Sequence, residues 1–210
     1  MFRLYKIVSV FILVLTTSCY CFSQPAAFIP DNANLFVFPF DTVAIFSDLV
    51  NNGNIGSMPG SVVNFYGQQW NNADSAQLYG DGGNYRFLNA TGSVGNKGPQ
   101  FVMGGYHVNT NSGVSFPNLS IENVSGLYLE DLSDLKVRDT LHFNRGHLYL
   151  NGWNAVVGEN NPGVINGYNK SSYVVTGSTI AGGYLYRSQV PASDTALIYP
   201  VGTDNVSYSP

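Results

Sequence analysis

Short apolar-polar-apolar triplets recur in the second half of the chain. They begin at positions 119, 127, 135, 141 and 148. In an extended strand the outer residues of such a triplet point to one side and the middle residue points to the other. Residues 127–129 (Leu-Tyr-Leu) return as residues 148–150. Three such strands with their turns occupy about 21 to 22 residues, the length of one coil of a three-sided parallel β-helix. The pattern therefore predicts an all-β fold, a three-sided parallel β-helix (β-solenoid).

This register predicts which residues stack in successive coils. Leu127 is expected on Leu148 inside the coil, Tyr128 on Tyr149 outside it, and Asn123 on Asn144 at a turn. The other predicted stacks are Leu119 on Leu141, Ile121 on Phe143, Leu135 on Val156 and, in a fainter earlier series, Val43 on Phe65, Phe65 on Phe87, Val63 on Tyr85 and Val94 on Phe116.

The same pattern suggests boundaries. Residues 24–42 contain several prolines and are expected to cap the open end of the solenoid. The parallel β-helix is expected over residues 43–177. Residues 178–210 are expected to begin a β-sandwich-like module that the sequence cuts short. A β-sandwich is the competing fold for the whole chain, since its strands also recur at short intervals.

Residues 1–23 have the parts of a cleavable signal peptide. Arg3 and Lys6 supply positive charge, and residues 7–15 form an apolar core too short to span a bilayer. Cleavage is expected between Ser23 and Gln24. The competing interpretation, a lipid-modified Cys19, lacks the branched apolar residue expected three positions earlier. Either way the chain is expected outside the cytoplasm, in the extracellular space or on the outer cell surface.

Removal of this segment changes the composition. Both cysteines leave with it, and loss of Arg3 and Lys6 takes Lys and Arg from 9 to 7 against 13 acids, a net charge near −6. Disulfides and cysteine-ligated zinc are excluded for the mature chain. Without a basic field, nucleic acid is not an expected partner. No later apolar run reaches the length of a membrane span.

Several segments resemble the repeats of large Bacteroidota surface proteins. The segments are residues 62–70 (VVNFYGQQW), 116–123 (FPNLSIEN), 146–152 (GHLYLNG), 172–177 (SYVVTG), 199–202 (YPVG) and 208–210 (YSP). The resemblance covers about residues 43–210. It implies an adhesin-like protein of the type IX secretion and gliding-motility-associated kind, here as an N-terminal fragment without the family's C-terminal sorting domain. The implied role is structural or adhesive rather than enzymatic, with the export machinery, extracellular glycans or other surface proteins as partners.

The same phylum is associated with O-glycosylation of Asp-(Ser/Thr)-apolar triplets. The four candidate acceptors are Thr42, Ser75, Thr140 and Thr195. The competing interpretation is that Asp-Thr simply ends a turn before a strand.

Acidic residues gather near position 130, and some β-helix enzymes cleave polysaccharides with paired carboxylates. Asp131 and Asp134 are the catalytic candidates of this alternative function. However, no second carboxylate is expected to stack beside them in the next coil, so solvated turn acids are the favoured interpretation. Calcium binding by the same acids is a weaker alternative, because the loop lacks an EF-hand pattern.

The remaining candidates are aromatic and imidazole side chains. Tyr128, Tyr149 and Trp153 could form a glycan-binding face, since a pyranose packs on aromatic rings; alternatively, the stacked tyrosines only stabilise the solenoid. The histidines His107, His142 and His147 lack metal-ligand spacing. No metal and no cofactor are expected.

Overall fold

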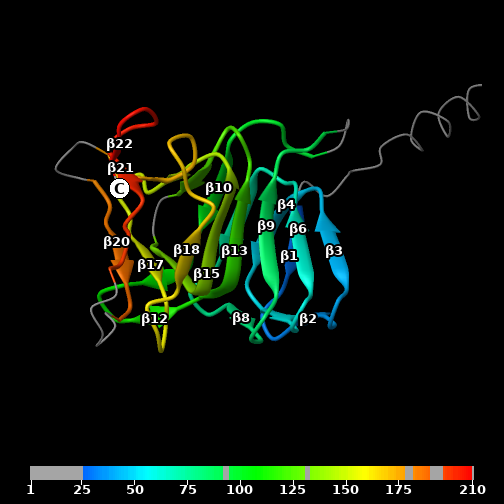
Figure 1. Cartoon of the computed structure of the whole chain (residues 1–210). Helices are drawn as coiled ribbons and strands as arrows, with labels where there is room; N and C mark the ends of the chain where they lie inside the picture. The colour runs from blue at the N-terminus through cyan, green and yellow to red at the C-terminus, as the bar shows by residue number, and fades with distance from the viewer. Residues whose placement is uncertain (1–25, 92–94, 131–132, 178–181, 190–195, 210) are drawn as a thin grey trace, which may run out of the picture.

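The computed structural model describes residues 26–91, 95–130, 133–177, 182–189 and 196–209. None of these residues is helical, and the strands stack side by side into a parallel β-solenoid of about seven coils (Figure 1). The colour runs from blue to red along the stack, so each coil adds to the one before it. The predicted signal peptide 1–23 and the Ser23–Gln24 cleavage pair lie outside the described residues.

Three sheets form the sides. Sheet A consists of β1 (Ala26–Ile29), β4 (Asp48–Asn51), β7 (Gln69–Asn72), β10 (Gln100–Met103), β14 (Leu127–Leu129), β16 (Leu148–Tyr149), β19 (Val174–Val175), β21 (Val201–Gly202) and β22 (Tyr208–Ser209). Sheet B consists of β2 (Asn34–Val37), β5 (Asn54–Ser57) and β8 (Gln77–Tyr79). Sheet C consists of β3 (Thr42–Ile45), β6 (Val62–Phe65), β9 (Asn84–Leu88), β13 (Phe116–Glu122), β15 (Leu135–Arg145), β17 (Ala155–Val157), β18 (Val164–Asn166) and β20 (Leu185–Arg187).

Nearly all strand pairs between coils are parallel. The β11–β12 hairpin (Tyr106–His107 and Ser112–Gly113) and the pair β21–β22 are the antiparallel strand pairs of the described residues. The long strand β15 pairs with two strands of the next coil within sheet C, its first part with β17 and its second with β18. This parallel stacking excludes the sandwich alternative, whose sheets are antiparallel.

The core is a set of inward columns along the stack. Leu127, Leu148 and Val174 occupy successive coils of sheet A, and each is fully buried. In the earlier coils the same interior holds rings: Phe65 contacts Trp70 edge-on at 5.3 Å and Phe87 at 5.3 Å. Alternating apolar residues therefore form strands here because each inward side chain is buried against the coil above and below.

The predicted register is confirmed where the triplets repeat. Leu127 pairs with Leu148 and Tyr128 with Tyr149. The predicted stacks Leu119–Leu141, Ile121–Phe143, Val63–Tyr85 and Phe65–Phe87 are also present.

Other predicted stacks are wrong by a small shift. Val43 pairs with Val63 instead of Phe65, and Leu135 pairs with Ala155 instead of Val156. These coils are shorter than the assumed period, because turn length varies from coil to coil. The Val94 prediction lies outside the described residues, and its proposed partner Phe116 pairs with Val137.

The predicted Asn123–Asn144 stack is also wrong. Asn123 donates from Nδ2 to Gln100 Oε1 at 3.0 Å, whereas Asn144 donates to Glu122 Oε2 at 3.2 Å. A register irregularity after Ile121 separates the two asparagines.

Both predicted boundaries of the solenoid need correction. The residues expected to form a cap, 24–42, contain β1 and β2, which pair in parallel with β4 and β5 as a coil. Pro30 and Pro39 lie outside the strands, where no ladder N–H is required. At the other end, β20 and β21 pair in parallel with β17 and β19. The described part of residues 178–210 thus continues the solenoid up to β21, and β22 then pairs antiparallel with β21.

Among the described residues, no helix is long and apolar enough to cross a membrane.

Candidate functional site

An aromatic ladder runs along the outer surface of sheet A. Phe101, Tyr128 and Tyr149 occupy the same register position in β10, β14 and β16. The ring centroids of Tyr128 and Tyr149 are 4.1 Å apart and their planes differ by 5°. Phe101 follows on the other side of Tyr128 at 5.6 Å and 39°. The two tyrosines predicted as a glycan face therefore form one continuous stack with Phe101.

The position of Tyr149 depends on a glycine in the preceding coil. A Cβ added at Gly126 would lie 2.6 Å from Cε2 of the Tyr149 ring. Gly126 also has a φ of 89°, in the left-handed region. Burial, and secondarily the neighbouring Tyr128, raises the pKa of Tyr149 to about 12. The ring leans over Gly126 toward Tyr128, and its hydroxyl stays protonated at physiological pH.

A groove of about 320 Å³ opens at the end of this ladder. Its lining comes from β14, β16 and β19 and the turns after β16 and β19. The described lining residues are Tyr128, Tyr149, Asn151, Gly152, Val175, Thr176, Gly177 and Gly182. Asn151 and Gly152 both have positive φ, 54° and 92°, so the turn after β16 reverses tightly and leaves this space open.

Trp153, the third predicted member of the glycan face, is not among these lining residues. Its side chain is half-buried and packs against the hydrophobic core. Its backbone N–H closes the turn by donating to Leu150 O at 2.9 Å. The structure therefore gives Trp153 a packing role outside the lining of the groove.

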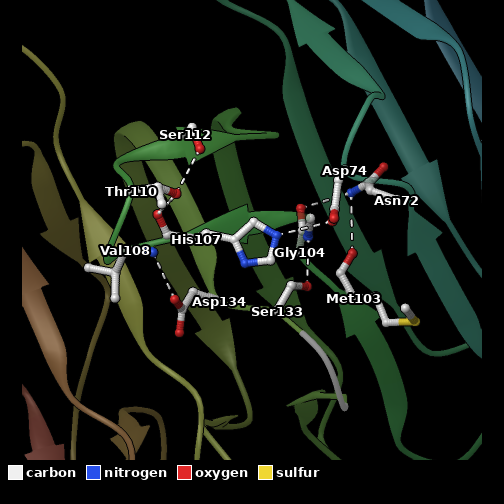
Figure 2. Close-up of polar contacts among 11 residues, drawn as sticks. Asn72, Asp74, Met103, Gly104, His107, Val108, Thr110, Ser112, Ser133 and Asp134 are labelled. Atoms are coloured by element: carbon white, nitrogen blue, oxygen red, sulfur yellow. Dashed lines mark hydrogen bonds and ion pairs between the residues drawn. The ribbon is translucent and has the colours of Figure 1, made fainter.

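Asp134, the candidate catalytic acid, is buried and fully engaged in hydrogen bonds. Its Oδ2 accepts from Val108 N at 2.9 Å, and its Oδ1 accepts from Asn154 N at 2.8 Å and Asn154 Nδ2 at 2.9 Å. Figure 2 shows this carboxylate turned toward Val108, in the loop of the β11–β12 hairpin. Asp134 thus fixes the hairpin to the coil, which corrects the prediction of a solvated acid. Asp131 lies outside the described residues.

The hairpin also carries an imidazole–carboxylate pair. His107 Nε2 lies 3.2 Å from Asp74 Oδ1, and both side chains are substantially exposed (Figure 2). Thr110 Oγ1 donates to His107 O at 3.4 Å and shares a 2.8 Å hydrogen bond with Ser112 Oγ. The hydroxyls therefore bond to each other and to the backbone, and neither of them is hydrogen-bonded to the imidazole in the described part of the chain.

The other two histidines lie apart from His107. His142 Nδ1 is hydrogen-bonded to Asn166 Oδ1 across sheet C. His147 contacts the ring of Tyr173 edge-on at 4.5 Å, and burial lowers its pKa. Within the described ranges no three His, Cys, Asp or Glu side chains are arranged to hold a metal ion.

Arg138 is a residue that the sequence did not single out. Its guanidinium donates to four oxygens at 2.7–2.9 Å: Leu78 O, Gly80 O, Ser115 O and Ser115 Oγ. It lines a pocket of about 390 Å³ beside β8, where sheet B ends. Its partners are 23 to 60 residues away in the sequence, so no local pattern marked it.

Three of the four predicted glycosylation acceptors lie in the described residues. Thr42 begins β3 and is exposed, and Ser75 is exposed in the turn between β7 and β8. Thr140 is half-buried within β15, between Asn118 and Val164 of the neighbouring strands. Thr195 lies outside the described residues. Access for a modifying enzyme is therefore best at Thr42 and Ser75.

Comparison with protein-family models, curated proteins and solved structures gives no match.

Proposed function

We propose that this chain is an exported, non-catalytic structural or adhesin-like protein of the bacterial cell surface, with the solenoid as its stalk or display surface. The observation that carries the proposal is the parallel pairing of sheet A from β1 to β21. A stack in which each coil rests on the last is a rod, and a rod presents long faces to other molecules.

The hydrogen bonds made by the buried polar side chains agree with a structural role. Gln100 donates from Nε2 to Phe65 O at 3.1 Å and Gly67 O at 2.9 Å, and its Oε1 accepts from Asn123. These amides are engaged in joining coils. Asp134, the described acid of the enzymatic alternative, is likewise engaged by three donors. We therefore favour the stalk over a polysaccharide-cleaving enzyme.

Export and surface location rest on the sequence. The signal-peptide pattern of residues 1–23 supports secretion, and the resemblance to type IX secretion cargo of Bacteroidota supports the outer surface. Extracellular glycans or other surface proteins are the proposed partners.

The experiment is expression of the full chain in a Gram-negative host, followed by mass spectrometry of the exported product. A mature N-terminus at Gln24 supports the proposal, and an intact Met1 end in the cytoplasm overturns export. The purified product is then incubated with pectin, cellulose and chitin. Release of reducing ends from any of them would overturn the non-catalytic assignment.

A further inference from the structure

The ladder on sheet A ends in two rings: Phe101, whose register partner in the preceding coil is Gln69, and Tyr149, whose ring centroid lies 5.7 Å from that of His147. Tyr128 is covered on one face by Tyr149 and on the other by Phe101. A flat ligand cannot lie on Tyr128, because both faces of its ring are occupied. Tyr149 is covered by Tyr128 on one face, and its other face points toward the coil that contains β19.

Beyond Tyr149 the side chains at this position become small. Val175 is the register partner of Tyr149, and Gly202 is the partner of Val175. The ladder therefore passes from a ring to an isopropyl group and then to no side chain. The edge of the Tyr149 ring lies over Gly126 in the preceding coil. Tyr149 and Val175 both line the groove of about 320 Å³.

Polar groups at two edges of the groove are oriented by the fold. Asn151 donates from Nδ2 to Leu129 O at 3.2 Å, which leaves Oδ1 as an acceptor. Thr176 donates from Oγ1 to Gly202 O at 3.2 Å, which leaves the lone pairs of its oxygen as acceptors. A ligand for this groove needs an apolar face flanked by hydroxyl donors.

We propose that this groove binds one neutral pyranose ring of an extracellular glycan, with the C–H face of the sugar on Tyr149 and its hydroxyls on Asn151 and Thr176. The inference rests on the proposed surface function and names its ligand class. The described lining residues carry no formal charge, and the volume is at the small end of ligand sites, which suits a single ring. The acidic chain as a whole disfavours uronic acids.

Saturation-transfer NMR on the exported full chain tests this inference. The probes are the methyl glycosides of glucose, galactose and mannose, with methyl glucuronide as the acidic comparison. We expect transfer to the C–H protons of one ring face of at least one neutral glycoside, and weaker transfer to the glucuronide. Absence of transfer to all three neutral glycosides, or a preference for the glucuronide, overturns the inference.

Four variants locate the contact. Tyr149→Leu removes the ring and is expected to weaken binding about tenfold, whereas Tyr149→Phe keeps the ring and is expected to preserve it. Thr176→Val is expected to weaken binding about fivefold through loss of one acceptor. Phe101→Leu, at the opposite end of the ladder, is the matched control and is expected to leave binding unchanged.

Unchanged binding in Tyr149→Leu, or equal losses in Tyr149→Leu and Phe101→Leu, would contradict a site at the end of the ladder. The urea midpoint of each variant is measured in parallel, and Thr176→Val gives the result if Tyr149→Leu is poorly folded. Sugar binding by a chain that is not exported would overturn the proposed function alone. An exported chain without sugar binding would overturn only this inference.

Discussion

Asn51 donates from Nδ2 to Oδ1 of Asn72 at 3.0 Å, and both amides are buried inside the solenoid. The same oxygen accepts from Trp70 Nε1 at 3.0 Å. Asn72 Nδ2 in turn lies within 3.4 Å of Met103 O and 3.3 Å of Gly104 O in the next coil. One side chain thus joins three consecutive coils.

Asn72→Ala is expected to lower the free energy of unfolding by about 3 kcal/mol, because it leaves the buried donors of Asn51 and Trp70 without an acceptor. Urea unfolding followed by tryptophan fluorescence measures the change. The matched control is Asn54→Ala, which removes a 3.0 Å hydrogen bond to Asn34 on the exposed side and is expected to cost less than about 1 kcal/mol. Equal losses would contradict a special role for Asn72.

Stability is expected to depend on the ionisation of Glu122. Arg86 donates to its two carboxylate oxygens at 2.5 and 2.8 Å, and these hydrogen bonds hold the pKa of Glu122 below its usual value. A lowered folded-state pKa means that the contribution is fully present above the unfolded-state value, about 4.3, and is lost as pH falls through the folded-state value. Glu122→Gln should therefore reduce the unfolding free energy at neutral pH by about 1.5 kcal/mol.

The measurement is a series of urea titrations of both proteins from neutral to strongly acidic pH. The difference between wild type and Glu122→Gln is expected to shrink below the unfolded-state pKa. A difference that stays constant with pH would show that the ion pair is not its source.

The variant Asp134→Asn tests whether Asp134 has a structural or a catalytic role. The amide cannot accept from both Val108 N and the two Asn154 donors, so a loss of about 2 kcal/mol in unfolding free energy is expected. Asp139→Asn, an exposed acid in β15, is the control and should change stability by less than about 0.5 kcal/mol. A stable Asp134→Asn variant that had lost a polysaccharide-cleaving activity of the wild type would instead favour the enzyme.

Gly146 marks a turn where two coils approach closely. Its φ is 86°, and an added Cβ would lie 1.8 Å from Asn123 O. Gly146→Ala is expected to cost at least about 2 kcal/mol through backbone strain and this clash. In the control Gly98→Ala, the added Cβ meets only Asn96 Oδ1, at 3.6 Å. Differential scanning calorimetry should show a large fall in Tm for the first variant and a small change for the second.

The sequence predicted the solenoid because inward positions in adjacent coils require side chains of similar size. Leu127 and Leu148 repeat for this reason. The outward residues Tyr128 and Tyr149 repeat with the same spacing along the chain. A fixed period cannot reveal insertions. Tyr85 and Leu119 are ladder neighbours although 34 residues separate them, since the chain between them also forms β10 and the β11–β12 hairpin.

The same limit applies to the candidate site. The Tyr128–Tyr149 stack followed from the local repeat. The groove beside it depends on Thr176 and Gly182, which come from a later and longer turn. Likewise, the partners of Asn72 and Arg138 are set by coil lengths that only the folded chain defines.

The stacking of strands across the solenoid axis has a mechanical consequence. The backbone hydrogen bonds between coils run along that axis, so tension applied at the two ends pulls them apart directly and one coil at a time. Each coil of about 21 residues would release roughly 70 Å of extended chain as it peels away. Under a pulling load, such a rod would lengthen in steps, and each step would dissipate work before the attachment at either end failed.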